Sequence, residues 1–401
     1  MSASCEAPVV LLAVTGGVGA FKGVLLLRML QRAGYDVRVL ATANALRFVG
    51  EPTWHALSHH PVVQNVWDPG NAPAGEVHVE LSRAASAMII YPATARVVGS
   101  LAAGITDDIV TLTAACMTGP VIVCPAMHTA MAEWDLHASA KRALAEGGVH
   151  VVEPVRGELA SGEVGFGRLP EPEVALQAVQ RALSPQDLAG RTVLVSAGPT
   201  REHIDPVRFL SNPSTGRMGY AVAAVAARRG GRVILVSGPT TLPTPQGVER
   251  VDVVSAAQMA QVVLDRAQDA HVVVMTAAVA DFRPRTRAPD KLKKDASGGL
   301  SAIPLEPTAD ILAALGAAKG DRVLIGFAME TADLVANARA KLERKNLDLI
   351  VGNDLNEAGA GFGTPTNVVT LVSADGVQEL PLLTKEEVAM RILDRAVTFL
   401  G

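Results

Sequence analysis

VVLLAVTGGVGAFKGVLLLRMLQRAGYDVRVL, residues 9–40, decides the fold of the first half of this 401-residue chain. Val9–Val14 is a continuous apolar run, the pattern of a strand that is buried on both faces. Residues 20–33 have helical spacing, and Gly34 stands at the position of a C-cap glycine. A second strand is predicted at residues 37–40. Strand, glycine turn, helix and strand in this order predict a parallel sheet covered by helices.

The alternation of predicted strands and helices continues along the chain and begins again in the second half. Further short apolar runs predict strands at residues 88–91, 121–123, 149–152, 193–195, 233–236 and 272–275. Residues 183–190 contain Ser, Pro and Gly and read as a short linker, so we divide the chain into domains at 1–186 and 187–401. We expect two α/β domains that each begin with a strand, a glycine-rich turn and a helix, rather than a solenoid repeat.

Composition excludes several classes of protein. Hydrophobic residues make up 49% and charged residues 19%, which supports a large buried core. A formal net charge of -4 argues against a general nucleic-acid binder. No run of about 18 apolar residues predicts a membrane span, and the N-terminus lacks the basic region of a signal peptide. Cys5, Cys116 and Cys124 have no CxxC spacing, so we expect a cytoplasmic protein without a disulfide framework or a zinc site.

The turn TGGVGAFK at residues 15–22 indicates anion binding without identifying the anion. It is not a P-loop, because no Gly-Lys-Ser/Thr follows at the required spacing, and it does not match GxGxxG. Glycines between a strand and a helix let backbone N–H groups approach an anion at the helix N-terminus. A tight βα turn without a ligand would explain the glycines equally well.

Several motifs of the first half must therefore be taken together. They stand at residues 10–22, 37–42, 48–49, 91–95, 104–108, 125–127 and 157–162. As a set they resemble the flavin-dependent cysteine decarboxylase family, from about residue 9 to about residue 183. The resemblance implies a flavodoxin-like domain with FMN at the carboxyl ends of the strands. It places at FMN the residues Gly16, Gly17, Thr42, Pro92, Ala93 and Thr94.

His78 begins the sequence His-Val-Glu-Leu, which matches the catalytic histidine motif of that family. The resemblance implies oxidation at the cysteine carbon that bears sulfur, by hydride transfer to FMN, then loss of CO2 and return of the electrons. The cofactor carries the difficult chemistry. His78 would assist proton removal or orient the substrate. A lone histidine is more often structural, and the chain has nine of them.

Three positions depart from the pattern of the family. Arg96 and His128 stand where an asparagine is usual, and Ser161 stands where the substrate clamp usually has a cysteine. His128 can replace the asparagine as a donor to the substrate carboxylate. A serine hydroxyl is a far weaker acid than a thiol, whose pKa is about 8.5. Cys124 follows a predicted buried strand and is expected in the core. The sequence therefore does not identify the proton donor that replaces the clamp thiol.

Eight segments mark the second half. They are SAGPTRE at 196–202, IDPVR at 204–208, LSNPSTGRMG at 210–219, AAVADFRP at 277–284, KLKK at 291–294, GFAMET at 326–331, KLERK at 341–345 and VGND at 351–354. Together they are similar to the signature of phosphopantothenate–cysteine ligases, over about residues 187–400. The resemblance implies a Rossmann-like α/β ligase domain.

The residue types in these segments suit the phosphates of a nucleotide. Residues 211–219 combine small side chains with a predicted helix start after residue 215 or 216, where N–H groups can meet phosphate. The lysines of residues 291–294 stand in a loop that can close over phosphates. Lys341 and Lys345 share one face of a predicted helix. An ordinary capped turn and solvated charges are the alternatives.

The resemblance implies that CTP activates the carboxylate of 4'-phosphopantothenate as an acyl-cytidylate, and that the cysteine amine then displaces CMP. It places at CTP the residues Ala277, Ala278, Asp281, Lys291, Phe327, Lys341 and Lys345. Arg208 and Asn212 match residues that act on the acyl-cytidylate. A triphosphate also implies Mg²⁺, with Asp281 as its ligand, although the sequence shows no carboxylate cage.

The two resemblances in one chain imply consecutive steps of coenzyme A biosynthesis that end at 4'-phosphopantetheine. They also imply a homo-oligomer, built from trimeric flavoprotein cores and dimeric ligase domains. The net charge and the lack of a long apolar run argue against nucleic acid and membrane as partners. Three alternatives stay open. One is a ligase whose flavoprotein domain is degenerate and kept for assembly, the second is a non-enzymatic flavin-binding module, and the third is a different flavin or peptidyl-cysteine chemistry in the first half.

Overall fold

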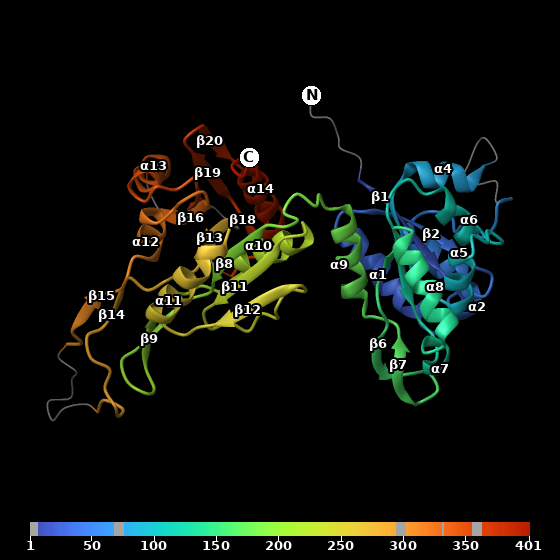
Figure 1. Cartoon of the computed structure of the whole chain (residues 1–401), viewed down its shortest axis with the longest axis horizontal. Coiled ribbons are helices and arrows are strands. Elements are labelled where there is room, and N and C mark those ends of the chain that lie inside the picture. Colours follow the sequence, from blue (N-terminus) through green and yellow to red (C-terminus); the bar gives the residue numbers. More distant parts are fainter. Residues whose placement is uncertain (1–6, 68–75, 294–301, 331–332, 355–362) are drawn as a thin grey trace. The chain divides into compact units, whose positions relative to one another are not determined.

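The computed structural model describes residues 7–67, 76–293, 302–330, 333–354 and 363–401. The chain divides into an N-terminal unit, Met1–Ser184, and a C-terminal unit, Pro185–Gly401 (Figure 1). The boundary that we predicted from sequence lies two residues further along, after residue 186. Within the described ranges, none of the helices is long and apolar enough to cross a membrane.

The N-terminal unit is built on a five-stranded parallel sheet in the order β2-β1-β3-β4-β5. Its strands are β1 (Val9–Val14), β2 (Asp36–Ala41), β3 (Ala85–Ala93), β4 (Val121–Pro125) and β5 (His150–Val151). This is the strand order of flavodoxin-like folds, which bind ligands at the switch point between β1 and β3. The fold class predicted for this half is confirmed.

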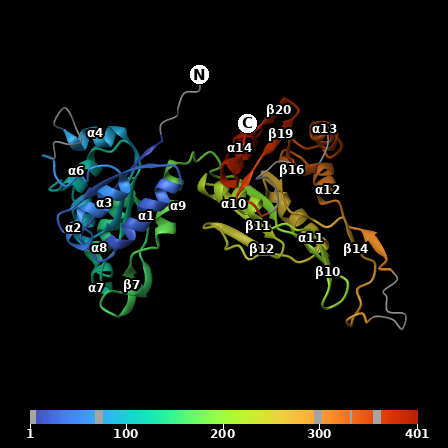
Figure 2. The ribbon, with the colours of Figure 1, turned by 180° about the vertical axis from the view of Figure 1, so that it is seen from behind.

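Helices cover both faces of this sheet (Figures 1 and 2). One face is covered by α1 (Ala20–Arg32), α3 (Glu51–Ser58) and α9 (Pro172–Leu183). The other is covered by α4 (Val77–Ala84), α5 (Ala95–Ala102), α6 (Ile109–Cys116) and α8 (Asp135–Glu146). Because successive side chains of a strand point to opposite faces, Leu12 packs in the first core and its neighbour Leu11 in the second. The apolar run of β1 is therefore buried on both faces, as predicted.

The ends of the strands carry shorter elements. The helix α2 (Ala45–Phe48) follows β2, the helix α7 (Thr129–Ala132) follows β4, and a hairpin of β6 (Val155–Glu158) and β7 (Val164–Arg168) follows β5. Helix α1 ends as predicted, because Gly34 has φ +89°, a conformation that glycine adopts without strain.

The C-terminal unit has an eight-stranded sheet in the order β12-β11-β8-β13-β16-β17-β19-β20. Its strands are β8 (Thr192–Ala197), β11 (Arg232–Ser237), β12 (Val248–Asp252), β13 (Val272–Met275), β16 (Val323–Glu330), β17 (Leu349–Asp354), β19 (Val369–Ser373) and β20 (Gly376–Glu379). The strands from β12 to β17 are parallel and follow the dinucleotide-binding order 3-2-1-4-5-6. Strands β19 and β20 extend the sheet antiparallel. The predicted Rossmann-like domain is confirmed.

Both faces of this sheet are also covered. Helices α10 (Arg217–Arg228) and α14 (Lys385–Thr398) pack on one face. Helices α11 (Ala256–Arg266), α12 (Ile311–Ala317) and α13 (Leu334–Arg344) pack on the other, with a short turn η1 (Ala267–Asp269) after α11. Three pairs of short strands complete the unit: β9 (Arg201–His203) with β10 (Phe209–Ser211), β14 (Phe282–Pro284) with β15 (Leu305–Pro307), and β18 (Thr366–Asn367) with β21 (Leu383–Thr384). Helix α10 begins directly after Gly216, as predicted.

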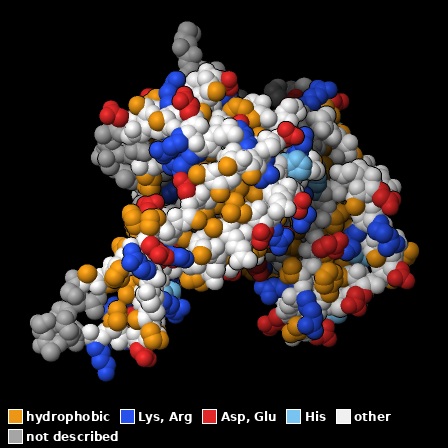
Figure 3. All heavy atoms as spheres, turned by 60° about the vertical axis from the view of Figure 1, so that its left-hand side comes forward, with side chains coloured by type: hydrophobic (Ala, Val, Ile, Leu, Met, Phe, Trp, Pro, Cys, Tyr) orange, Lys and Arg blue, Asp and Glu red, His pale blue; other side chains and the backbone are white. Residues whose placement is uncertain are grey.

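One face of the molecule carries charged side chains of both signs. On the face that Figure 3 shows, the coloured basic and acidic side chains are interspersed among apolar ones. A nucleic-acid footprint would instead gather lysines and arginines on one face. This distribution agrees with the net charge of -4.

Candidate active sites

A cavity of about 800 Å³ opens in the N-terminal unit at the carboxyl ends of β1 and β3. It is lined by five of the six residues predicted to hold FMN: Gly16, Gly17, Thr42, Pro92 and Thr94. The sixth, Ala93, is buried in β3 instead, where its carbonyl accepts the N–H of Ala126 at 2.9 Å. The volume lies within the range of ligand pockets, roughly 300–1,000 Å³.

Thr15 ties the glycine turn to the loop after β3. Its hydroxyl donates to the Pro92 carbonyl at 2.7 Å and accepts the N–H of Thr94 at 3.0 Å. An added Cβ at Gly17 would stand 3.7 Å from Thr94 Cγ2 and would occupy the space above this loop. The turn and the loop therefore form a cradle within the cavity, and this cradle fits a flavin.

The rim of the cavity carries the three residues that depart from the family pattern. Arg96, on α5, is ion-paired with Asp108, and this hydrogen bond raises the pKa of the guanidinium. His128 Nε2 lies 2.8 Å from a carboxylate oxygen of Glu163, in the turn of the β6–β7 hairpin. Ser161 lies exposed in the same turn. The imidazole is thus hydrogen-bonded to the hairpin, and the positive charge of Arg96 is compensated.

His78 does not line this cavity. It is the second residue of α4, and its Nδ1 atom is buried without a hydrogen-bond partner among the described residues. A buried polar atom of this kind calls for an explanation, which a bound molecule or a second chain would provide. Cys124 is fully buried in β4, where burial raises the pKa of its thiol. The prediction that Cys124 is a core residue is confirmed.

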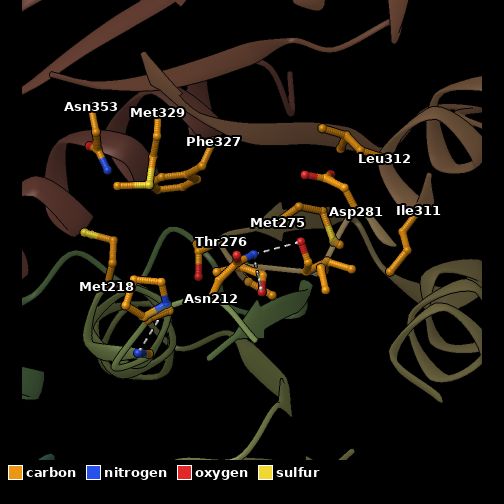
Figure 4. Close-up of a pocket in the computed structure, with 18 of the residues that line it drawn as sticks. Asn212, Met218, Met275, Thr276, Asp281, Ile311, Leu312, Phe327, Met329 and Asn353 are labelled. Atoms are coloured by element: carbon orange, nitrogen blue, oxygen red, sulfur yellow. Dashed lines mark hydrogen bonds between the residues drawn. The ribbon is translucent and has the colours of Figure 1, made fainter. Parts of the chain in front are cut away.

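A second cavity, of about 670 Å³, lies in the C-terminal unit (Figure 4). It is lined by seven residues predicted for the ligase: Asn212, Ala277, Ala278, Asp281, Phe327, Lys341 and Lys345. They come from the segments after β10 and β13, from β16, and from α13 and its C-cap. Because the carboxyl ends of parallel strands meet at one edge of a sheet, the fold gathers these separate motifs.

Both sides of this cavity combine a polar with an apolar side chain. Asp281 lies beside Leu312 on one side, and Asn353 lies beside Met329 on the other, with Phe327 between them (Figure 4). Hydrogen bonds fasten the polar side chains of the walls to the backbone. Asn212 Nδ2 lies 3.4 and 3.2 Å from the carbonyls of residues 278 and 279, and the Nζ of residue 341 donates to the Phe327 carbonyl at 2.9 Å.

Asp310 adds a carboxylate to this cavity that the sequence analysis missed. It caps α12 by accepting the N–H of Ala313 at 3.0 Å, and Lys345 Nζ lies 2.7 Å from its Oδ2 atom. Burial opposes its ionisation, but the bonds from Lys345 and Ala313 and the charge of Lys341 hold the pKa of Asp310 below its ordinary value. On this side of the cavity, the positive charges of Lys345 and Lys341 therefore compensate the negative charge of Asp310.

Arg208 and Lys291 do not line this cavity. Arg208 lies between β9 and β10, and its Nε and Nη2 atoms stand 2.9 and 2.6 Å from Oδ2 of the buried Asp205. The same Oδ2 accepts the N–H of Leu292 at 3.2 Å, and Arg208 donates to the Leu292 carbonyl at 2.8 Å. The structure therefore brings Arg208 and the Lys291 segment together, but outside the cavity of their own chain. Lys294 lies outside the described residues.

Further polar lining residues were not assigned from sequence: Arg217, Asn353, Asn367 and Lys385. Asn353 stands in the quoted motif VGND, which was a usable signal. Lys385 is the first residue of α14, and in sequence it is indistinguishable from a surface lysine of a helix. Only the fold shows that it faces the cavity.

The carboxylates at this cavity form no cage for a metal. Across the described part of the chain, no three His, Cys, Asp or Glu side chains converge. Mg²⁺ in nucleotide sites is commonly held by one or two carboxylates together with substrate phosphates. Asp281 at the cavity therefore fits a metal that arrives with the nucleotide.

The fold defines an α/β protein that joins a flavodoxin-like unit to a Rossmann-like unit, each with a ligand-sized cavity. Comparisons with known proteins agree. Residues 2–184 match the family described as Flavoprotein. Residues 188–400 match the family described as DNA/pantothenate metabolism flavoprotein C-terminal domain.

Relatives of similar length name the family. The coenzyme A biosynthesis bifunctional protein CoaBC of Bacillus subtilis (strain 168) is 44% identical over 392 residues, which are 96% of this chain and 95% of that protein. The CoaBC protein of Escherichia coli (strain K12) is 40% identical over 392 residues, 97% of this chain and 96% of that protein. The chain belongs to this family of bifunctional enzymes, which combine a ligase and a decarboxylase. A ligase-only chain is not favoured, because the relatives match both units.

Solved structures are similar to one unit at a time. The C-terminal domain of a CoaBC protein is 46% identical, covers 54% of this chain and 98% of its own, and has a TM-score of 0.46. A PPC decarboxylase mutant complexed with pantothenoylaminoethenethiol is 29% identical, covers 43% of this chain and 97% of its own, and has a TM-score of 0.40.

Proposed function

We propose that the chain catalyses two consecutive steps of coenzyme A biosynthesis in the cytoplasm. Residues 187–401 join cysteine to 4'-phosphopantothenate at the expense of CTP, and residues 1–186 decarboxylate the product to 4'-phosphopantetheine with FMN. The observation that carries the proposal is the cavity of the C-terminal unit, where seven residues that were selected from separate motifs meet. A chance set of surface residues would not converge in this way.

The ligase cavity suits activation of a carboxylate. A carboxylate is a poor electrophile, so its oxygen first attacks the α-phosphorus of CTP and pyrophosphate leaves. The cysteine amine then attacks the acyl carbon and CMP leaves. Lys341 and Lys345 stabilise the developing negative charge, and Asn212 can donate to a carbonyl or phosphoryl oxygen. Asp281 is the residue that would hold Mg²⁺, which neutralises phosphate charge when bound.

Arg208 and Lys291 serve the same reaction in this proposal, although they lie outside the cavity of their own chain. A dimer of ligase units would bring them to the cavity of a second copy. Exposed apolar side chains in the same region support an interface there, since Phe209 and Phe282 are 41% and 53% exposed. The trimeric flavoprotein core remains part of the proposal for the N-terminal unit.

The N-terminal cavity suits FMN. The glycine turn offers backbone N–H groups, and the loop of Pro92 and Thr94 faces the cradle above Gly17. When bound, FMN supplies the electron acceptor and donor for the cysteine carbon. On the rim, His128 would donate to the substrate carboxylate in place of its present partner Glu163. His78 lies away from this cavity and would act at the site of a neighbouring chain.

A coupled assay tests both activities. FMN-loaded protein receives 4'-phosphopantothenate, cysteine, CTP and Mg²⁺, and products are followed by mass. We expect 4'-phosphopantetheine with release of CO2, which would show that Ser161 does not prevent turnover. Accumulation of 4'-phosphopantothenoylcysteine alone would refute the decarboxylase step, and absence of both products would refute the ligase step.

A further inference from the structure

Asp205 lies where two predicted ligase residues, Arg208 and Lys291, come together outside the ligase cavity. Its side chain is fully buried in the turn between β9 and β10. Burial of a carboxylate is costly unless both of its oxygens have partners. Here the two oxygens serve different parts of the chain, and this division shows what the carboxylate does.

The Oδ1 atom of Asp205 shapes the turn between the two strands. It accepts the N–H of Val207 at 2.8 Å and the N–H of Arg208 at 2.7 Å. Bonds from an aspartate to the backbone a few residues further on are typical of tight turns. An asparagine can make the same bonds with its amide oxygen, so this half of the side chain does not require a carboxylate.

The Oδ2 atom of Asp205 joins two segments that are distant in sequence. It accepts hydrogen bonds from Nε and Nη2 of Arg208, at 2.9 and 2.6 Å, and from the N–H of Leu292 at 3.2 Å. Arg208 Nη2 also donates to the Leu292 carbonyl at 2.8 Å, which closes a ring of hydrogen bonds. An amide NH2 group in place of Oδ2 would face three donors. This half of the side chain therefore does require a carboxylate.

The same contacts fix the backbone on both sides of Lys291. The N–H of Ala288 donates to the Ile204 carbonyl at 2.9 Å, and Leu292 is bonded to Asp205 and Arg208. Lys291 itself is exposed. It is thus an exposed cation on an anchored backbone, and a preordered segment loses less conformational entropy when it binds a ligand.

The guanidinium of Arg208 is oriented by the same ring. Its side chain remains 45% exposed, although Nε and Nη2 are bonded to Asp205 and Leu292. The Nη1 atom has no hydrogen-bond partner among the residues that the structure describes. Because the N–H groups of arginine form a rigid planar fork, fixing one edge also sets the direction of the other. Nη1 is therefore available to an acceptor outside this unit.

We propose that Asp205 is a positioning residue of the ligase, which presents Arg208 and Lys291 together to the cavity of a second copy of the chain. The inference rests on the proposed ligase function and its dimer, in which the two cations serve different steps. Lys291 meets the triphosphate while the acyl-cytidylate forms, and Arg208 meets the acyl-cytidylate when cysteine attacks it. Asp205 touches neither substrate, but both steps depend on the placement that it provides.

The kinetic test separates the two steps in the full-length protein. A burst of pyrophosphate at varied CTP, without cysteine, reports the first step. Conversion of the accumulated acyl-cytidylate after cysteine is added reports the second. We expect Asp205→Asn to raise the CTP concentration for a half-maximal burst rate about tenfold and to slow the second step about tenfold. Lys291→Met should impair the first step alone, because it removes one cation and leaves the ring intact.

Hydrogen exchange gives a readout that does not depend on catalysis. Asp205 Oδ2 accepts the Leu292 N–H, so Asp205→Asn should speed exchange in the peptide that contains Leu292 at least about tenfold. The matched control is Asp348→Asn. Asp348 also joins a lysine to a backbone N–H, at 2.7 Å from Lys319 and 2.8 Å from Leu324, but it lies outside the cavity. The control should change neither the exchange at Leu292 nor either step.

Four results would overturn the proposal. Unchanged exchange at Leu292 would show that the carboxylate does not hold this segment. Faster exchange with both steps unchanged would show that the placement does not matter to the reaction. Impairment of one step alone would leave Asp205 serving one cation only. Faster exchange throughout the C-terminal unit would show a general loss of stability instead.

A second variant keeps the test open if Asp205→Asn does not fold. In Arg208→Lys the charge stays, but a lysine cannot bond Asp205 and the Leu292 carbonyl with the same rigid fork. The burst should then need more CTP, although Arg208 itself serves the second step, and an unchanged CTP dependence would overturn the proposal. A wild-type protein that releases no pyrophosphate would refute the ligase function itself, and this is seen before any variant is compared.

Discussion

Gly219 allows α10 to approach the sheet, and its replacement by alanine should damage the ligase without unfolding the chain. A Cβ atom at this position would lie 2.4 Å from Thr276 Oγ1, 2.5 Å from Ala197 Cβ and 3.0 Å from the Ser196 carbonyl oxygen. Ordinary contacts between carbon atoms are about 3.5–4.0 Å, so α10 must retreat by about 1 Å. Overpacking of this kind costs about 1–3 kcal/mol, and the better helix propensity of alanine offsets at most about 1 kcal/mol.

The consequence for the site is larger than the consequence for stability. A retreat of about 1 Å carries the first N–H groups of α10 beyond hydrogen-bond distance of a phosphate, whose limit is about 3.2 Å. A hydrogen bond to a charged group contributes about 1.5–3 kcal/mol. Loss of one such bond should raise the KM for CTP roughly 10- to 100-fold. The unfolding free energy should fall by no more than about 3 kcal/mol.

The assays are pyrophosphate release at varied CTP and denaturation in urea. Gly99→Ala is the control, because the Cβ it would add in α5 meets no atom within 4 Å beyond its chain neighbours and the backbone of its own helix. This control should gain up to about 1 kcal/mol of stability and keep the wild-type KM. A Gly219→Ala enzyme with reduced stability but an unchanged KM would refute the role of α10 in phosphate binding. A gain in stability as large as that of Gly99→Ala would refute the packing argument.

Three further predictions concern separate sites. Gly16→Ala would place a Cβ 2.4 Å from Asn44 Cβ. Purified protein should therefore lose its flavin absorbance while pyrophosphate release continues. A wild-type flavin content would contradict the assignment of this turn to the FMN site. Lys341→Met removes the ammonium group that donates to the Phe327 carbonyl. It should raise the KM for CTP by about tenfold and leave the FMN content unchanged. An unchanged KM would show that this lysine does not bind CTP. Burial opposes ionisation of Asp205, but an arginine fork and three backbone N–H groups hold its pKa well below the ordinary value. Its contribution to stability is therefore complete above about pH 5 and is lost as the pH falls toward the native pKa. Asp205→Asn should flatten the acid limb of urea stability measured from about pH 5 to pH 2, and an unaltered limb would refute this role.

The sequence by itself determined the elements and the type of fold. Continuous apolar runs such as Val9–Val14 identify strands buried on both faces, because a strand covered by helices on both sides has no polar face. Glycines at the ends of helices, such as Gly34, mark where the chain turns. The motifs also identified most residues of both cavities, since each motif is a local run at the end of a strand, where side chains of an α/β fold meet a ligand.

Only the tertiary structure decided which residues share a cavity and which do not. His78, Ala93, Arg208 and Lys291 were predicted for the sites, yet none of them lines the cavity of its unit.

Lys385 shows the reverse case. A lysine in the first turn of a helix has the same local pattern in solvent and in a cavity, so its sequence carries no signal. Its burial and its place near Arg217 arise when β18 and β21 pair and draw the start of α14 toward the amino end of α10. Contacts between segments so distant in sequence depend on how the sheet is assembled, and no local pattern encodes them.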